Sequence, residues 1–213
     1  MKLLFVTATN TDIGKTFTTL KLIENIGKHK IKVGVCKPIE TGVDNEPKDA
    51  KLLLKKVQKY NNNFKSLTPK DITAYTFSLP SAPFCADINQ EIKVAKIKKK
   101  IEELSKLCDI LIIEGAGGLF VPITKDYMMI DLAEELNAKV LLVTPSKLGC
   151  INDTMLSIEA LKSRDIDFDW CVNLYLNRED FNIVTKPFYD SYFTKWWILE
   201  DRLDDFIKNF YNY

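Results

Sequence analysis

Five short apolar runs recur along the chain, and each is separated from the next by enough residues for a helix. The runs are residues 3–6, 33–36, 110–113, 140–143 and 170–174. Short continuous apolar runs are typical of strands that are buried on both faces, and their alternation with helical segments indicates a parallel sheet. We therefore predict an α/β fold of three layers, in which helices flank a mostly parallel central sheet.

The segments between these runs show helical periodicity. One apolar face recurs over residues 94–108. A helix through Leu52–Val57 is predicted to begin with Asp49 as its cap, although a metal carboxylate would also suit that position, and a later helix is predicted to be capped by Asn152 or Asp153. The predicted loops and irregular segments are residues 61–63, 66–71 and 78–83.

The segment that joins the first strand to a helix closes on Gly14-Lys15-Thr16. Gly14 lets the backbone approach phosphate oxygens, Lys15 supplies a cation to the β- and γ-phosphates, and the Thr16 hydroxyl can ligate Mg²⁺ at a helix N-terminus. Thr9 replaces the usual first glycine, so the loop is a variant. Its position between a strand and a helix predicts a triphosphate-binding loop and an α/β fold of the P-loop NTPase type.

Two more strand ends carry candidate groups. Glu114 ends the third run and precedes a glycine-rich turn over residues 115–118, which suits an Mg²⁺ ligand beside the phosphate loop. Lys37 follows the second run, so it can meet Lys15 at one sheet edge and offset charge on a transferring phosphoryl group. Thr41, a few residues further on, offers a hydroxyl to a substrate or belongs to an ordinary turn.

The size and charge of the chain limit the functions that it can have. With 213 residues and 46% hydrophobic content, the chain has the size of one domain, predicted to span residues 1–213. Thirty basic and 29 acidic residues leave a formal charge of +1, which argues against a nucleic-acid partner. The apolar runs are too short for a signal-peptide core or a membrane span, so we expect a cytoplasmic protein without a membrane partner.

The cysteine and histidine residues give no indication of a catalytic or metal site. The five cysteines are widely separated and never form a Cys-x-x-Cys pair, which argues against a disulfide framework and a zinc site, so we expect them to be reduced. The single histidine, His29, lies among lysines and is expected at the surface. These observations argue against a histidine-based catalytic triad and a multi-histidine metal site.

Three motifs downstream of the phosphate loop make residues 1–175 resemble the dethiobiotin synthetase family. They are Lys37-Pro-Ile-Glu-Thr-Gly42, Glu114-Gly-Ala-Gly-Gly118 and Lys147-Leu-Gly-Cys-Ile-Asn152, in the family's order. The resemblance implies a ligase of biotin biosynthesis that closes the ureido ring of dethiobiotin from 7,8-diaminononanoate, CO₂ and ATP. It implies that a carbamate attacks the γ-phosphate and that the second amine then expels phosphate from a carbamic-phosphoric anhydride.

The resemblance also implies roles for individual residues. Lys37 and Lys15 are implied to be catalytic, and Thr16, Asp49 and Glu114 to hold Mg²⁺, so that Asp49 becomes a metal ligand instead of a cap. The implied nucleotide-binding residues are Asp12, Ile13, Gly14, Lys15, Thr16, Phe17, Asp49, Glu114, Gly115, Ala116, Gly117 and Asn173, the last of which contacts the base.

A substrate site between subunits is implied as well. Thr41 falls where the family contacts the diamine. Gly149, Cys150, Ile151 and Asn152 are implied to bind the substrate carboxylate of the neighbouring subunit in a homodimer, and an anion is favourable at the helix N-terminus they form.

The last part of the chain departs from the family pattern. Ala8 replaces the family's usual first loop glycine, and Asp12 stands where Glu is common. The Gly-Glu-Ile-Pro segment that contacts the base in the family has no counterpart, and an aromatic-rich segment of about residues 175–213 follows instead. Its rings can stack on a base or pack the sheet edge, and packing is the stronger expectation because clustered aromatic side chains usually bury area. The choice among ATP, GTP and CTP stays open.

Two other functions fit the phosphate loop. An amidoligase of the cobyrinate type would carry an additional glutaminase domain, which the predicted single domain does not provide. A ParA/MinD-like switch ATPase would carry an extra lysine early in the loop, and residues 8–13 contain none. Both functions are less favoured than the synthetase.

Overall fold

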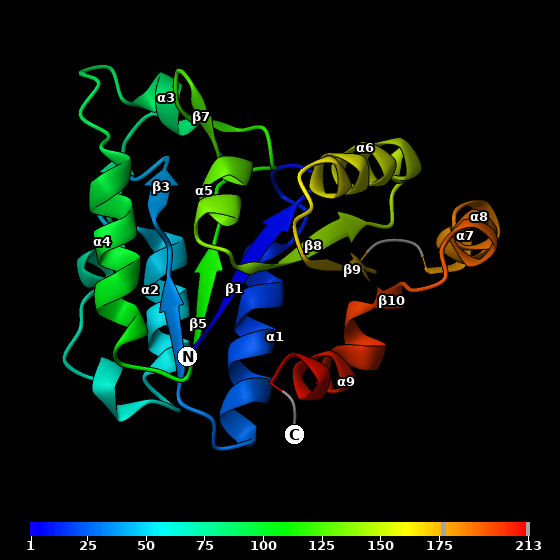
Figure 1. Ribbon diagram of the computed structural model, residues 1–213, viewed down its shortest axis with the longest axis horizontal. Helices are drawn as coiled ribbons and strands as arrows, with labels where there is room; N and C mark the ends of the chain where they lie inside the picture. The colour runs from blue at the N-terminus through cyan, green and yellow to red at the C-terminus, as the bar shows by residue number, and fades with distance from the viewer. Residues whose placement is uncertain (176–177, 212–213) are drawn as a thin grey trace.

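The computed structural model describes residues 1–175 and 178–211. Six parallel strands form its central sheet, in the order β10-β9-β8-β1-β5-β2 (Figure 1). The strands are β1 Lys2–Ala8, β2 Val33–Cys36, β5 Ile110–Glu114, β8 Lys139–Pro145, β9 Phe168–Asn173 and β10 Trp197–Ile198. Five of them coincide with the five predicted runs, so the predicted parallel sheet is confirmed.

Helices cover both faces of this sheet (Figure 1). The helices are α1 Lys15–Lys28, α2 Lys48–Val57, α3 Pro83–Ala86, α4 Val94–Ser105, α5 Met129–Glu135, α6 Cys150–Ser163, α7 Arg178–Val184, α8 Lys186–Tyr192 and α9 Leu199–Tyr211. Helix α1 packs between α2 and α9, and α4, α5 and α6 lie on the other face. This arrangement is the predicted three-layer fold.

Two small strand pairs lie beside the central sheet. Strand β3 (Ile39–Thr41) pairs in parallel with β4 (Tyr75–Phe77), and β6 (Pro122–Thr124) pairs antiparallel with β7 (Tyr127–Met128). Strand β3 follows β2 directly in the chain, so the β3–β4 pair lies beyond the carboxyl end of β2.

Both predicted helix caps are wrong. Helix α2 begins after Pro47, so Asp49 lies inside its first turn. Helix α6 begins after Gly149, whose φ of 91° is a left-handed conformation that glycine adopts readily, so Asn152 lies inside the helix together with Asp153. Both helices therefore begin earlier than predicted, after Pro47 and Gly149, and neither of these residues caps its helix with its own side chain.

Two further local predictions need correction. The predicted loops over residues 61–63 and 66–71 contain short 3₁₀ turns, Asn62–Phe64 and Pro69–Asp71. The first turn forms because Asn61 Oδ1 accepts the backbone N–H of Asn63 at 3.0 Å. Leu52 points to solvent with 52% exposure, since its neighbours Leu53 and Leu54 occupy the buried face of α2.

The hydrophobic core is continuous from the first strand to the last helix. Buried residues of one cluster extend from Leu4 on β1 to Phe210 on α9. Within the central sheet, Val6 of β1 pairs with Glu114 of β5. Because both strands run in the same direction, this register brings the phosphate loop after β1 next to the glycine-rich turn after β5.

The aromatic C-terminal segment packs against the sheet edge. The ring of Trp170 on β9 lies 5.1 Å from that of Tyr189 and 4.7 Å from that of Phe193, centroid to centroid. These contacts favour the packing role over base stacking for this part of the segment. Asn177, which belongs to the same stretch, lies outside the described residues.

The structure also tests the expectations for the cysteines, for His29 and for membrane-spanning helices. The five cysteines carry free thiols, as predicted. His29 lies at the surface with a side chain that is 28% exposed, and its Nε2 is 2.6 Å from Asp204 Oδ1 on α9. Among the described residues, none of the helices has the length and apolar content needed to span a membrane.

Candidate functional site

A cavity of about 690 Å³ lies at the carboxyl ends of β1, β2 and β5. This is the edge at which ligands bind in open parallel sheets. The predicted site residues that line the cavity are Asp12, Gly14, Lys15, Thr16, Lys37, Thr41, Asp49, Ala116 and Gly117. Residues from four separate segments of the sequence therefore meet in one place.

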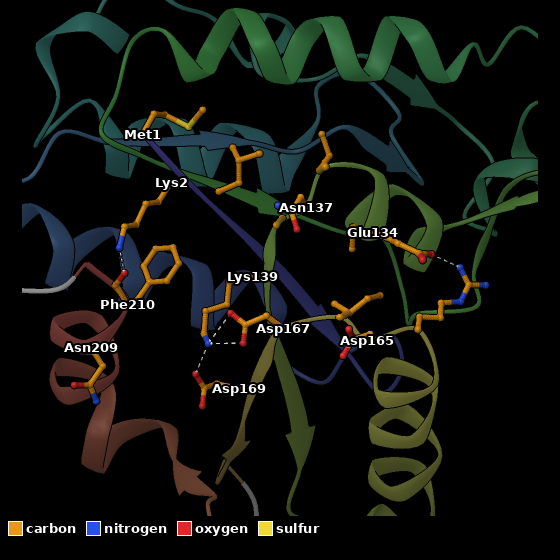
Figure 2. A pocket seen from close by; sticks show the side chains of 16 residues that line it. Met1, Lys2, Glu134, Asn137, Lys139, Asp165, Asp167, Asp169, Asn209 and Phe210 are labelled. Carbon is orange, nitrogen blue, oxygen red and sulfur yellow. Dashed lines mark hydrogen bonds and ion pairs between the residues drawn. The ribbon is translucent and has the colours of Figure 1, made fainter.

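A second cavity of similar volume lies at the amino ends of the strands (Figure 2). Several of its charged groups are already engaged in ion pairs. Lys139 Nζ is 3.0 Å from Asp167 Oδ1 and 3.0 Å from Asp169 Oδ2, and Arg164 pairs with Asp131 and Glu134. The carboxyl-end cavity, where two lysines converge, is therefore the candidate site.

The phosphate loop is held in shape by Asn173 at the end of β9. Its Nδ2 donates to the carbonyl oxygen of Ile13 at 2.9 Å. Gly14 has a φ of 100°, and a Cβ at this position would come within 2.1 Å of the same Nδ2. Glycine is therefore required both by the backbone conformation and by the packing of Asn173 against the loop.

Lys15 lies buried on the floor of the cavity. Its Nζ donates to the carbonyl oxygen of Asn10 at 2.9 Å. Burial, together with the nearby Lys37 ammonium, lowers the pKa of Lys15 from 10.5 to about 8. An anion at the loop would counter the repulsion between the two lysines, so the loop electrostatically favours a phosphate.

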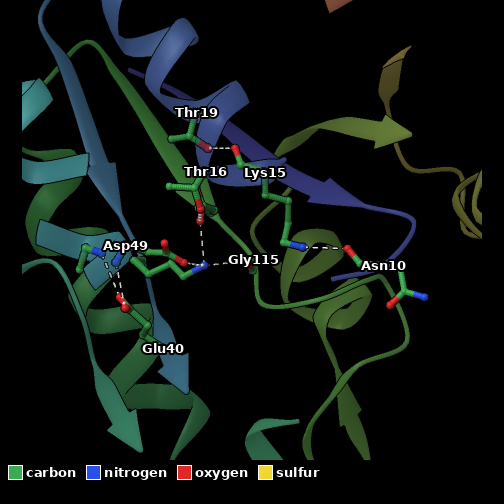
Figure 3. A network of polar contacts seen from close by, with 10 residues as sticks. Asn10, Lys15, Thr16, Thr19, Glu40, Asp49 and Gly115 are labelled. Atoms are coloured by element: carbon green, nitrogen blue, oxygen red, sulfur yellow. Dashed lines mark hydrogen bonds and ion pairs between the residues drawn. The ribbon is translucent and has the colours of Figure 1, made fainter. Parts of the chain in front are cut away.

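A network of polar contacts joins Lys37, Glu114 and Thr16. Figure 3 shows this network, with Thr16, Asp49 and Gly115 labelled. Lys37 Nζ donates to Glu114 Oε1 at 2.8 Å and to the carbonyl oxygen of Gly115 at 3.2 Å. Thr16 Oγ1 donates to the same Glu114 Oε1 at 2.9 Å. Burial alone lowers the pKa of Lys37, but the carboxylates of Glu114 and Asp49 outweigh it and raise the pKa above its usual value. Lys37 therefore stays charged.

The same residues fit a magnesium ion. Among the described residues, none forms a hydrogen bond with Glu114 Oε2, which is buried. Asp49 Oδ2 is 3.7 Å from Lys37 Nζ, so both carboxylates and the Thr16 hydroxyl lie around one amine. Mg²⁺ takes one or two carboxylates and keeps several waters, and this oxygen donor set provides that number.

Glu40 is a residue that sequence reasoning missed. Its Oε1 accepts the backbone N–H of Asp49 and its Oε2 that of Ala50, each at 2.9 Å (Figure 3). Glu40 therefore satisfies the N-terminus of α2, the role first predicted for Asp49, and the carboxylate of Asp49 can face Lys37. Glu40 precedes Thr41 in a motif that was recognised, but nothing in the spacing indicated a cap across nine residues.

The segment over residues 80–83 is a second omission. Pro80, Ser81, Ala82 and Pro83 line the cavity opposite the phosphate loop, as does Val121 after β5. The two prolines did mark this stretch as irregular. Its place over the site could not be read from the sequence, because it depends on the pairing of β3 with β4.

Some predicted residues lie away from this cavity. Ile13 is buried beneath the loop and Phe17 is 41% exposed on α1, with Lys21 Nζ 5.4 Å from its ring centroid. Neither of them lines the cavity, nor does Gly115. The same holds for Gly149–Asn152 at the start of α6, where the side chain of Cys150 is fully buried.

Comparison with known proteins adds what the geometry alone does not give. The chain is 56% identical over 209 residues to the ATP-dependent dethiobiotin synthetase BioD of Sulfurovum sp., covering 98% of this chain and 100% of that protein. The chain belongs to the dethiobiotin synthetase family. The proteins of the same name from Wolinella succinogenes and Helicobacter pylori are 36% and 37% identical, with 96% and 91% of this chain covered and 96% and 90% of each relative.

Family membership makes the chain an ATP-dependent ligase of biotin biosynthesis. A family model described as an AAA domain also matches residues 2–171. The predicted P-loop type of fold and the resemblance of the three motifs are thereby confirmed.

Solved structures of lower identity share only the fold. The MinD cell division protein of Aquifex aeolicus superposes with a TM-score of 0.54 at 18% identity, over 99% of this chain and 87% of that one. A plasmid partition protein of Borrelia burgdorferi gives 0.57 at 14% identity, over 99% and 95%. This chain therefore shares its fold with these two proteins, and the alternative of a switch ATPase gains no support from a shared fold.

Proposed function

We propose that the chain converts 7,8-diaminononanoate, CO₂ and ATP into dethiobiotin, ADP and phosphate at the carboxyl-end cavity. The observation that carries this proposal is the convergence of Lys15 and Lys37, both buried, on one cavity beside the buried Glu114. Two buried ammonium groups suit a reaction in which negative charge builds up on a transferring phosphoryl group. The identity to named synthetases over the full chain supplies the substrate class.

Each part of the site has a proposed task. The phosphate loop, residues 12–17, binds the nucleotide triphosphate through Lys15 and the backbone N–H groups at the start of α1. Thr16, Asp49 and Glu114 hold Mg²⁺, which when bound neutralises phosphate charge. Gly115, Ala116 and Gly117 line the nucleotide and substrate, and Asn173 contacts the base while it supports the loop.

The chemistry needs positioning more than proton transfer. An amine that has captured CO₂ is an anionic nucleophile, and its carboxylate oxygen forms a bond to the γ-phosphorus as the bond to ADP breaks. The second amine then attacks the carbamoyl carbon, phosphate leaves, and the ureido ring closes with loss of the amine proton to solvent. Lys37 lies beside the transferring group, where its fixed charge stabilises the transition state without a strong general base.

We further propose that the substrate site forms between two subunits. Thr41 lines the cavity and is placed to contact the diamine, whereas Gly149–Asn152 do not reach the cavity of their own chain. Lys147, Leu148 and Gly149 are exposed, and Leu148 is 86% exposed, which suits a contact with a second copy. The N-terminus of α6 would then bind the substrate carboxylate of the partner.

The proposal extends to the domain organisation and the cellular location of the chain. The continuous core from Leu4 to Phe210 supports a single domain. The use of ATP and a small diamine supports a cytoplasmic enzyme whose partners are small molecules and a second copy, without nucleic acid or membrane.

The first test is the reaction itself. The purified protein is incubated with Mg²⁺, bicarbonate and ATP, with and without 7,8-diaminononanoate, and phosphate release and the product mass are measured. We expect release that depends on the diamine, with formation of dethiobiotin, and GTP and CTP are assayed in parallel. Release that ignores the diamine would support a switch ATPase instead.

The shared site predicts complementation between two defective variants, assayed at a diamine concentration well below the raised KM of the second. Lys37→Ala damages the catalytic part of a site and Asn152→Ala the part from the other subunit. When the two are mixed and allowed to exchange subunits, mixed dimers hold one site with both defects and one with neither, so activity should return to about a quarter of wild type. Asn152→Ala alone should raise KM for the diamine and leave KM for ATP near its wild-type value.

The control is each variant incubated alone under the same conditions. If mixing restores nothing although native mass spectrometry detects the mixed dimers, both groups of residues serve a site within one subunit. If the protein stays monomeric at the assay concentration while turning over, the interface proposal is wrong.

A further inference from the structure

The loop over residues 147–152, here called the carboxylate loop, is exposed at its tip and anchored at its end. Lys147, Leu148 and Gly149 are exposed, whereas Cys150, the first residue of α6, is fully buried. The Cys150 thiol points into a cluster of buried hydroxyl groups that the proposed mechanism does not use. The cluster consists of Thr144, Cys150, Thr154, Thr185 and Tyr189, and each of these residues is at most 2% exposed.

The Tyr189 hydroxyl lies at the centre of this cluster. It is 3.0 Å from Thr154 Oγ1 and donates to Cys150 Sγ at 3.6 Å. Thr154 in turn contacts the hydroxyl of Thr144 at the end of β8, and Cys150 Sγ is 3.8 Å from Thr185 Oγ1. Buried hydroxyl groups cost free energy unless they are paired, so these groups hold one another in place.

Aromatic neighbours fix where the Tyr189 hydroxyl can be. The Tyr189 ring meets Trp170 edge-on, with centroids 5.1 Å apart and planes at 87°, and it contacts Phe181, Phe193 and Trp196 at 6.2, 5.7 and 5.6 Å. Close packing on several sides leaves the side chain one position. The Tyr189 hydroxyl, on α8, is therefore held in one position, and the first turn of α6 packs against it.

The two residues that Tyr189 contacts share one face of α6. Cys150 and Thr154 are four residues apart, so both point inward, and Asn152, two residues after Cys150, points to the opposite side, where it is exposed. When the contacts of Cys150 and Thr154 hold the inward face of α6 in place, they also determine the direction in which Asn152 and the carboxylate loop point.

We propose that Tyr189 is a positioning residue for the carboxylate loop, and that the C-terminal helices α7 and α8 serve substrate binding through it. The inference rests on the proposed function, in which this loop receives the substrate carboxylate. Tyr189 acts through Cys150 and Thr154 and does not touch the substrate. In this chain the aromatic segment thus has a specific task, which is to hold the first turn of α6.

Replacing Tyr189 by phenylalanine tests the inference, since the ring packing is kept and only the hydroxyl is lost. We expect KM for 7,8-diaminononanoate to rise about fivefold to tenfold, the size of one neutral hydrogen bond, with KM for ATP and kcat near wild type. Thr154→Val should have a similar effect, and Thr154→Ser, which keeps a hydroxyl, should stay close to wild type. Tyr127→Phe is the matched control, because it loses a phenol hydrogen bond to Glu135 elsewhere.

Hydrogen exchange followed by mass spectrometry provides a readout that needs no substrate. Amide exchange over residues 147–152 should be faster in Tyr189→Phe and Thr154→Val than in wild type, and unchanged in Tyr127→Phe. Unchanged exchange and an unchanged KM for the diamine in Tyr189→Phe would overturn the inference. A rise in both KM values, or equal loosening of the whole chain, would reduce Tyr189 to general stability and overturn it too.

The two proposals fail in different ways. If the wild-type protein makes no dethiobiotin, the proposed function is wrong, and faster exchange at the loop would still support the anchoring of α6 by Tyr189. If the wild type makes dethiobiotin and Tyr189→Phe matches it in both measurements, only the positioning role is wrong.

Discussion

Replacing Lys37 by alanine is expected to lower kcat by about two orders of magnitude or more, while nucleotide affinity stays close to that of wild type. Such a loss corresponds to roughly 3 kcal/mol or more of transition-state stabilisation. Lys37 is 4% exposed and its Nζ lies at the edge of the cavity, whereas the nucleotide phosphates are proposed to rest mainly on Lys15 and the loop backbone. Lys37 should therefore act chiefly in the transition state.

The same substitution should also lower stability. It leaves the fully buried Glu114 without its ammonium partner, and removal of one member of a buried ion pair costs about 3–5 kcal/mol. Chemical denaturation should show this loss, and added Mg²⁺ should recover part of it because a cation would again neutralise Glu114.

Steady-state kinetics together with titration of an ATP analogue separate these effects. Lys51→Ala, on α2, is the control, since Lys51 pairs only with Glu46 among the groups it is shown to contact and its side chain is 60% exposed. Normal turnover in a folded Lys37→Ala protein would remove Lys37 from the mechanism. A parallel loss of ATP affinity would instead make it a binding residue.

Replacing Glu114 by glutamine is expected to raise the Mg²⁺ concentration needed for half-maximal activity by about tenfold or more. The substitution keeps the shape of the side chain but removes the charge, and Mg²⁺ binds a carboxylate oxygen much better than an amide oxygen. Glu114 Oε2 is buried, and the described residues leave it without a hydrogen-bond partner. Removing the carboxylate charge at this position should therefore weaken Mg²⁺ binding more than it disturbs other contacts. Asp49→Asn should give a smaller shift, because the Asp49 side chain is 41% exposed.

Calorimetric titration of Mg²⁺ into the protein with an ATP analogue checks this without turnover. Glu46→Gln is a suitable control, since it neutralises an exposed carboxylate shortly before α2. Identical magnesium curves for wild type and Glu114→Gln would exclude Glu114 as a ligand. If only Asp49→Asn leaves the curve unchanged, Asp49 is a first-turn residue of α2 and nothing more.

The sequence predicts five of the six central strands and the phosphate loop, but not the short edge strand β10. Each apolar run became a strand of the central sheet, and the residues after β1, β2 and β5 came together at one cavity. These features are local, since a buried strand needs a continuous apolar run and a phosphate loop needs a glycine and a lysine at fixed spacing. The carboxyl ends of parallel strands then meet because of the topology alone.

The errors concern contacts across long sequence separations. Asp49 was first assigned the cap of α2, but the carboxylate of Glu40 satisfies those N–H groups. His29 lies at the surface as predicted, but its partner Asp204 comes from α9, 175 residues away, and was not foreseen. A cap or an ion pair of this kind has no signature in the local pattern, because either partner could equally face water.

The sequence by itself determined the parallel α/β fold, the phosphate loop, the family and the set of residues at the strand ends, because each depends on short patterns of apolar and special residues. Only the tertiary structure decided that Glu114 is shared between Lys37 and Thr16, that Glu40 frames Asp49, and that Tyr189 supports the start of α6. These pairings depend on burial, which makes an unpaired polar group costly and so selects one partner among many. Burial is a property of the packed chain, and the linear sequence does not contain it.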